Sequence, residues 1–143
     1  MRIKVLEQGS AKAWAVVLET GDEFIESLSS FAEANGLTAA SFTGIGALRK
    51  VVLGYFEWDR KEYKRIPIEE QVEVLALTGD VSLDKGRPKL HAHVVLGKPD
   101  GSAWGGHVME AHVRPTLELV VRETPATLRR AYDPESGLNL IKP

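Results

Sequence analysis

The chain has 143 residues, of which 43% are hydrophobic and 27% charged, a composition typical of one globular domain with its own core. Its net charge of −2 argues against a protein held to nucleic acid mainly by phosphate contacts, and the absence of cysteine excludes disulfides and thiolate metal ligands. The first residues lack the apolar run of a signal peptide, and no apolar stretch is long enough to span a bilayer. We therefore expect a cytoplasmic protein with a single domain over residues 1–143.

The N-terminal part of the chain predicts two strands followed by a helix. Residues 2–7 alternate between polar and apolar, and residues 13–18 are typical of a buried strand. Thr20 and Glu23 have the spacing of a capping box, with Thr20 as the N-cap of the helix. Apolar side chains then recur at helical spacing until Asn35-Gly36 supplies a stop. This amphipathic helix needs a sheet to cover its apolar face.

Most of the remaining chain predicts strands joined by short connections. We expect strands over 38–48, 51–58, 72–84, 89–97, 103–113 and 115–122, with one or two short helical turns near Pro125 to Arg130. A solvated loop is favoured over a basic patch for the segment that holds Arg60, Lys61, Lys64 and Arg65. The predicted fold class is α+β, a curled and mostly antiparallel β-sheet with one main α-helix packed on it.

Three of the four histidines lie within 17 residues of one another. Pro99-Asp100-Gly101 suits a three-residue hairpin loop, with proline in a type I turn and glycine in the left-handed position behind it. Such a loop pairs His93 with His107 and His91 with Met109, so that the three histidines share one face at Cβ separations of roughly 5 to 7 Å. Three neutral imidazoles at this spacing predict a metal site, His91, His93 and His107, with a fourth position open to water.

Other interpretations of this segment stay open at the level of sequence. A two-residue turn at Asp100-Gly101 would shift the register and place His107 on the opposite face. A His-x-His pair is also common on a plain solvated or interfacial strand face. Gly105-Gly106 fits either a close approach to the backbone or a simple bend. His112 should point away from the other histidines and lie beside Glu110, as a paired or surface side chain.

Four short segments follow one another in a characteristic order and spacing: Gly44-Ile45-Gly46-Ala47, the stretch Glu73 to Gly79, His91-Ala92-His93 and Gly105-Gly106-His107. Together they resemble the plant-and-prokaryote conserved (PPC) domain in its stand-alone prokaryotic form, over about residues 3 to 133. The resemblance implies a curved antiparallel sheet, a homotrimer and a distant kinship in fold with acetolactate decarboxylase, whose zinc is held by three histidines. It also implies that His91, His93 and His107 are the ligands and that zinc is the metal, whereas His112 does not match a ligand.

The same resemblance raises the question of DNA binding. Plant members of the family join this domain to AT-hooks, whose Arg-Gly-Arg-Pro core lies in a narrow minor groove. The segment Lys85-Gly86-Arg87-Pro88-Lys89 is similar to that core. It is only five residues long between two apolar strands, however, and Asp84-Lys85-Gly86 favours a hairpin turn. We expect no direct DNA binding without an AT-hook, and any DNA association to run through partners.

Residues and resemblance together predict a homotrimeric, zinc-binding PPC-domain protein that is regulatory or DNA-associated through partners. The alternative is a small zinc-dependent enzyme, decarboxylase-like or hydrolase-like, that acts on a small carboxylic or ester substrate. Arg49, Arg114 and Glu110 have the residue types to hold a carboxylate or give a proton, although Glu110 is predicted on the face opposite the histidines. The sequence therefore predicts ligands but assigns no catalytic residue.

Apolar residues outside the helix give independent support for an assembly. The strand Val51 to Phe56 is apolar on both faces, so it needs cover from the helix, from the other half of a curled sheet or from a neighbouring subunit. Trp14 is expected in the core, while Trp58 and Trp104 fit either core or interface.

Overall fold

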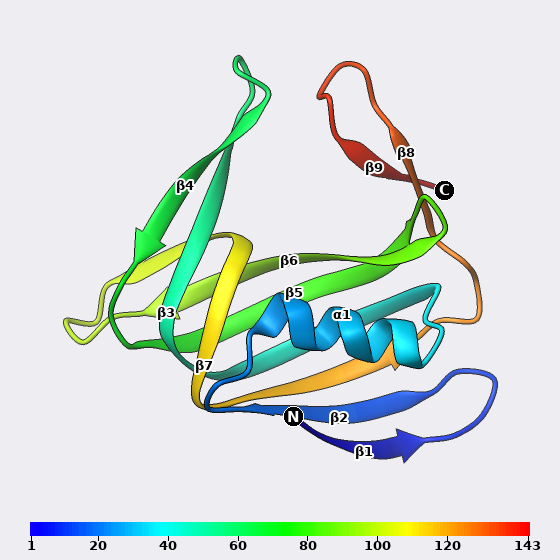
Figure 1. The fold of residues 1–143 in the computed structure, drawn as a ribbon, viewed down its shortest axis with the longest axis horizontal. Coiled ribbons are helices and arrows are strands. Elements are labelled where there is room, and N and C mark those ends of the chain that lie inside the picture. The colour runs from blue at the N-terminus through cyan, green and yellow to red at the C-terminus, as the bar shows by residue number, and fades with distance from the viewer.

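The computed structural model describes all residues 1–143 as one nine-stranded, strongly curled sheet with a single helix packed on it (Figure 1). The strands are β1 (Arg2–Glu7), β2 (Ala13–Glu19), β3 (Ala39–Glu57), β4 (Glu62–Ile68), β5 (Val72–Asp84), β6 (Arg87–Gly97), β7 (Ala103–Glu123), β8 (Arg129–Tyr132) and β9 (Asn139–Lys142), and the helix is α1 (Phe24–Ala34). The strand order is β1-β2-β7-β3-β5-β8-β9, with β4 paired to β3 and β6 paired to both β5 and β7. All pairs are antiparallel except β5 and β8, so the predicted α+β class is confirmed.

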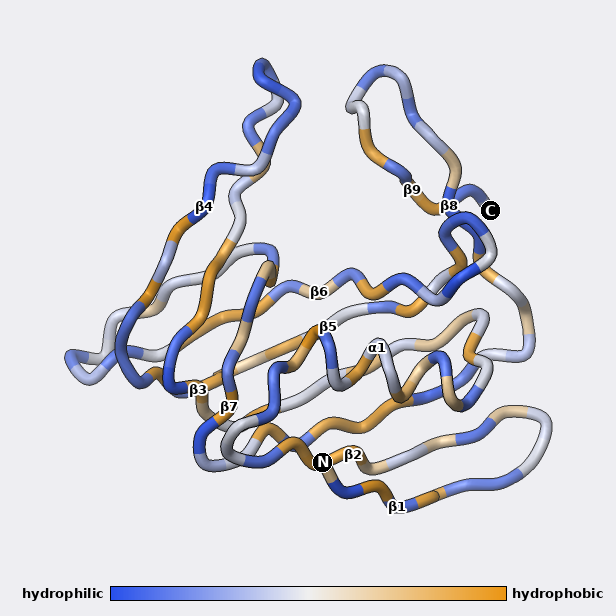
Figure 2. The backbone as a smooth tube through the Cα atoms, in the orientation of Figure 1, coloured by the Kyte–Doolittle hydropathy of each residue, from blue (hydrophilic) through white to orange (hydrophobic).

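The core lies between α1 and the face of the sheet that it covers. Phe31 of the helix meets Trp14 of β2 edge to face at 5.4 Å between ring centroids, and Phe24 meets Phe42 of β3 at 6.0 Å. These rings are almost fully buried, which confirms the core position expected for Trp14. Figure 2 shows the corresponding apolar colouring along the central strands and a hydrophilic tip on the β3–β4 hairpin. Trp58 and Trp104, in contrast, are 55% and 43% exposed in the single chain.

The start of α1 differs from the capping box predicted from sequence. Glu23, not Thr20, is the N-cap: its Oε2 accepts from the backbone N–H of Glu26 at 2.7 Å. Its Oε1 accepts from the N–H of Ala111 on β7 at 2.8 Å, so one carboxylate caps the helix and ties it to the sheet. These two hydrogen bonds explain why Glu23 and not Thr20 caps the helix, because its carboxylate accepts from backbone N–H groups on both α1 and β7. The predicted stop is confirmed, with Asn35 as C-cap followed by Gly36 at φ +61°.

The two longest strands each span two of the strands predicted from sequence. The expected breaks near residues 49–50 and at residue 114 lie inside β3 and β7, which are continuous over 19 and 21 residues. Register shifts interrupt their pairing at several points, including between Gly46 and Leu48. Such bulges bend a strand without ending it, so β3 and β7 can follow the curl of the sheet around the core.

Two polar segments were assigned wrongly from sequence. The segment expected to be a solvated loop contains β4, paired with β3 from Val51↔Ile68 to Glu57↔Glu62, and Arg60 is ion-paired to both glutamates of the last pair. The helical turns expected near Pro125 to Arg130 are absent, and β8 and β9 form a hairpin there instead. Both hairpins rise from the sheet as arms (Figure 1), and such short, polar strands carry little of the apolar alternation that predicts a strand.

The Lys85-Gly86 segment is a tight hairpin turn, as predicted. Lys85 and Gly86 both have positive φ, at 51° and 83°, and the flanking residues Asp84 and Arg87 are paired. The AT-hook-like residues are therefore built into the β5–β6 hairpin. The helix α1, with 11 residues, is too short to span a membrane.

Candidate metal centre

The loop between β6 and β7 sets the register on which the candidate site depends. The N–H of Gly101 donates to the Lys98 carbonyl and the N–H of Lys98 donates to the Ser102 carbonyl, both at 2.9 Å. Gly101 has φ +82°, the left-handed conformation expected for it. His93 is consequently paired directly with His107. The three-residue loop is thus confirmed, and the two-residue turn that would have turned His107 away is excluded.

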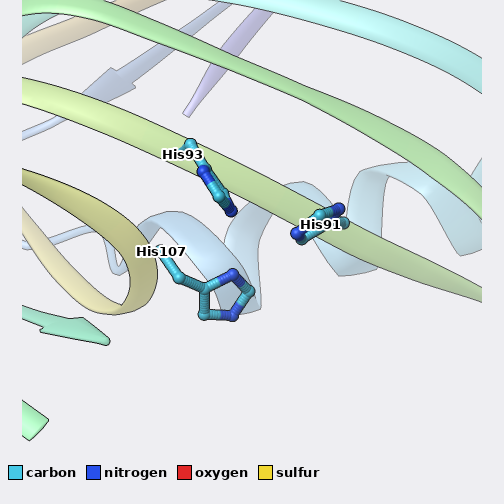
Figure 3. A group of neighbouring side chains, drawn as sticks. All are labelled: His91, His93 and His107. Atoms are coloured by element: carbon cyan, nitrogen blue, oxygen red, sulfur yellow. The ribbon is translucent and has the colours of Figure 1, made fainter. Parts of the chain in front are cut away.

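The three predicted ligands converge (Figure 3). His91 and His93 extend from β6 and His107 from β7, with ring centroids 5.0, 5.3 and 5.6 Å apart. One ring nitrogen from each lies within 4.8 Å of the others. Nitrogens bound to one tetrahedral zinc lie about 3.3 Å apart, as bond lengths of about 2.0–2.1 Å require. Small rotations of the imidazoles would therefore close the set around an ion.

A cleft adjoins the histidines because β7 leaves β6 at this point. The β6–β7 ladder ends at His93↔His107, and β7 pairs with β3 beyond it, so the predicted pairing of His91 with Met109 is not formed. The seam between β6 and β7, where their pairing ends, opens into a cavity of about 540 Å³. Its walls come from α1, β4, β6, β7 and the C-terminal hairpin, and include Tyr63, Lys89, Met109, Arg130, Leu138 and Leu140.

Desolvation keeps two of the three histidines in the form that binds metals. The pKa of His107 is lowered to about 4, mainly by burial and to a lesser extent by its neighbours His91, His93, Lys89 and Arg130. Burial also lowers the pKa of His93, with His91 as the second cause. Both imidazoles are therefore neutral near neutral pH and can offer a lone pair to a cation.

The surroundings of His107 fit a metal ligand. Its Nδ1 is buried and has no hydrogen-bond partner, which is unusual because buried polar atoms are nearly always satisfied. The Tyr63 ring stacks on the imidazole at 4.8 Å between centroids and shields one side of it. Three imidazoles without a thiolate or a carboxylate among them form a donor set that suits zinc, copper, iron and nickel.

A charged network behind His91 was not predicted from sequence. Asp80 is the cross-strand partner of His91, and its Oδ2 lies 3.5 Å from His91 Nδ1. Its Oδ1 accepts from Arg130 Nη2 at 2.7 Å and from the Ser82 hydroxyl at 3.1 Å. Burial works to raise the pKa of Asp80, but His91, Arg130 and Ser82 outweigh it and hold that pKa below its ordinary value. It could have been predicted from the turn at Lys85-Gly86, because the register that this turn sets pairs Asp80 with His91.

The residues considered for catalysis do not join the histidines. Glu110 hydrogen-bonds His112 at 2.7 Å and pairs with Lys50 at 3.4 Å, which confirms that His112 lies beside it. Arg114 donates two hydrogen bonds to Gln71, at 2.9 and 2.7 Å. Arg49 lines a separate polar pocket with Arg114. None of these three candidate residues lines the cleft beside the histidines.

The lowered pKa of His107 predicts a pH-dependent stability for the metal-free protein. Because the pKa lies near 4 in the fold and near its ordinary 6.5 when unfolded, the unfolded chain binds more protons in this interval. The stability should therefore be full above pH 6.5 and fall as the pH is lowered toward 4. Urea unfolding of chelator-treated protein at several pH values measures this, and His107→Gln should flatten the dependence. Equal pH dependence in wild type and His107→Gln would contradict the assignment, and His112→Gln is the control.

Comparisons with known proteins agree with the observed fold. The family model of the Plants and Prokaryotes Conserved (PCC) domain matches residues 5–125. Three solved structures are similar over nearly their whole length. A metal-containing protein from Archaeoglobus fulgidus is 33% identical, with 99% of this chain and 97% of that one covered and a TM-score of 0.86. A plant- and prokaryote-conserved protein from Pyrococcus horikoshii is 31% identical, with 99% of this chain and 95% of that one covered and a TM-score of 0.87. A Bacteroides thetaiotaomicron protein proposed to bind DNA is 28% identical, with 98% of this chain and 96% of that one covered and a TM-score of 0.88.

More distant matches add the fold and the domain context. A Staphylococcus aureus protein described as similar to α-acetolactate decarboxylase is 12% identical with a TM-score of 0.58, over 77% of this chain and 51% of that one. This confirms the expected kinship in fold alone. The chain is also 26% identical over 139 residues to the bifunctional protein GlmU of a Synechococcus strain, and it spans only 21% of that relative's length.

Proposed function

Because the chain belongs to the Plants and Prokaryotes Conserved domain family, we propose that it is a homotrimeric zinc-binding module of that family. His91, His93 and His107 are the ligands. The observation that carries the proposal is the convergence of three imidazoles, one of which has a buried ring nitrogen without a partner. The similar metal-containing protein from Archaeoglobus fulgidus supports a metal in this fold.

Zinc is the proposed metal because neutral imidazole nitrogens suit it and no redox chemistry is required of it. Three imidazoles would leave one position for a fourth ligand, and the ion would supply Lewis acidity there. Two features of the chain suit His107 to bind the ion. Burial keeps its imidazole neutral, and Tyr63 stacks on one face of the ring. The apolar side chains Met109, Leu138 and Leu140 are among those that line the adjoining cleft.

An exposed apolar face supports the assembly. His93, Thr78, Thr43 and Val120 are paired in one row across four strands, so they share the sheet face that α1 does not cover. Three large apolar side chains on this face are 60%, 55% and 43% exposed: Ile45, Leu75 and Val95. An uncovered apolar area of this kind is typical of an interface, and copies of the chain are the proposed occupants.

The wider role that we propose is regulatory, with any contact to DNA made through partners. The similar Bacteroides thetaiotaomicron protein is proposed to bind DNA. In this chain the net charge is −2 and the AT-hook-like residues are held in a tight hairpin. Neither feature favours direct binding to phosphates, which needs a basic surface.

The cleft favours a second candidate function, a small zinc-dependent enzyme. A cavity of about 540 Å³ beside the histidines is large enough for a small organic molecule. Its apolar walls and Lys89 would suit a small carboxylic or ester compound. The two functions differ in the number of protein ligands to the zinc. A structural ion has a fourth protein ligand, whereas a catalytic ion has a water in that position. X-ray absorption of the zinc-bound protein distinguishes them.

Native mass spectrometry tests the principal proposal in one measurement, because it reads subunit number and bound metal together. Untagged protein that has been stripped of metal and incubated with zinc should appear as a trimer with one zinc per chain. His91→Ala should remain folded by circular dichroism and carry no zinc. A zinc-free wild type would overturn the metal site, and a monomer with bound zinc would overturn only the assembly.

A further inference from the structure

We propose that Asp80 is a positioning residue for the metal site, holding His91 Nδ1 so that Nε2 is the nitrogen presented to the other two imidazoles. This inference rests on the proposed zinc site and adds a part of it that the ligands alone do not reveal. Asp80 and His91 are direct cross-strand partners on β5 and β6, so the backbone itself places the carboxylate against the ring. Asp80 Oδ2 lies 3.5 Å from His91 Nδ1.

The other carboxylate oxygen of Asp80, Oδ1, accepts two hydrogen bonds. Oδ1 accepts from Arg130 Nη2 at 2.7 Å and from the Ser82 hydroxyl at 3.1 Å, and Arg130 Nε donates to that same hydroxyl at 2.8 Å. The carboxylate is thus fixed on one side and free only toward His91. A neutral imidazole that donates from Nδ1 carries its lone pair on Nε2, which is the form needed for an Nε2 ligand.

The anchor of this network comes from the C-terminal hairpin. Arg130 lies on β8, its side chain is only 8% exposed, and Nη1 donates to the Asn139 carbonyl of β9 at 3.3 Å. It also lies beyond residues 5–125, the part of the chain that the family model matches. The hairpin therefore does more than wall the cleft: through Arg130 and Asp80 it fixes the orientation of a ligand ring.

Partners of this kind affect metal affinity because they fix the tautomer of a ligand and raise its basicity. Asp80 is the only acid whose carboxylate pairs with a histidine ring of the triad, so His93 and His107 have no comparable carboxylate. The effect of losing Asp80 should accordingly appear in zinc affinity and in the tautomer of His91, and not only in stability.

The experiment compares Asp80→Asn with Asp84→Asn in the full chain. Asp84 is the matched control because it also lies on β5 and also binds the C-terminal hairpin, accepting from Asn139 Nδ2 at 3.0 and 3.1 Å, but it contacts no histidine. The zinc dissociation constant, measured by competition with a chromophoric chelator, should rise about 10- to 100-fold in Asp80→Asn and stay unchanged in Asp84→Asn.

A second measurement needs no variant, which matters if Asp80→Asn fails to fold. Imidazole ¹⁵N shifts of the metal-free wild type at mildly alkaline pH should show His91 protonated on Nδ1 and unprotonated on Nε2. The opposite tautomer, or an unchanged zinc affinity in Asp80→Asn, would overturn the positioning role while leaving the zinc site intact. A wild type that binds no zinc would overturn both the site and this inference.

Discussion

His107→Ala should weaken zinc binding by more than about 100-fold, the upper end of the loss expected for an outer partner of a ligand. His107 is the ligand that bridges the seam: His91 and His93 share β6, and His107 alone comes from β7. Without it, two imidazoles remain on one strand, and the set no longer surrounds an ion. Titration of the metal-free variant against a chromophoric chelator measures the loss.

The control for this variant lies five residues away on the same strand. His112→Ala removes a histidine that hydrogen-bonds Glu110 and lies outside the triad, so zinc affinity should stay at the wild-type value. Circular dichroism of both variants excludes unfolding as the cause of any difference. Wild-type affinity in His107→Ala would show that the zinc is bound elsewhere and would refute the site.

The histidine cluster was predictable because its geometry depends on local chemistry. One turn, Pro99-Asp100-Gly101, fixes the register, and cross-strand pairing then decides which side chains share a face. The same reasoning applied to Lys85-Gly86 would have placed Asp80 beside His91. Arg130 could not be found in this way, because the only backbone pairing between β8 and β5 is the parallel pair Leu83↔Arg129, which no turn determines.

The fold was predictable where apolar periodicity is strong and was missed where it is weak. The helix and the buried strand β2 carry clear patterns, whereas β4 and β8 are exposed along most of their length. The cap at Glu23 was missed for a different reason. Its carboxylate accepts from Ala111, 88 residues away, and a long-range contact of this kind overrides the local spacing that favoured Thr20.

Gly79→Ala should destabilise the protein by about 3 kcal/mol, the upper part of the range for overpacking in a core. Gly79 lies on β5 between Phe42 of β3 and Ala92 of β6. A Cβ there would overlap the carbonyl oxygen of His91 and the ring of Phe42, which is 1% exposed and has no room to move. Since one of the two obstacles is backbone, the strand that carries His91 and His93 would have to shift.

Urea unfolding of the metal-free proteins measures this cost, with Gly97→Ala as the matched control. Gly97 is also a strand glycine, on β6, but its added Cβ would meet only the flexible side chain of Leu75, which is 55% exposed in the single chain and is not packed in the core as Phe42 is. That substitution should change the free energy of unfolding by less than about 1 kcal/mol, because alanine suits a strand interior better than glycine. Equal effects of the two substitutions would mean that the contact between β5, Phe42 and His91 is looser than the structure has it. A loss confined to Gly79→Ala, accompanied by weaker zinc binding, would tie the position of the ligand strand to the packing of the core beneath it.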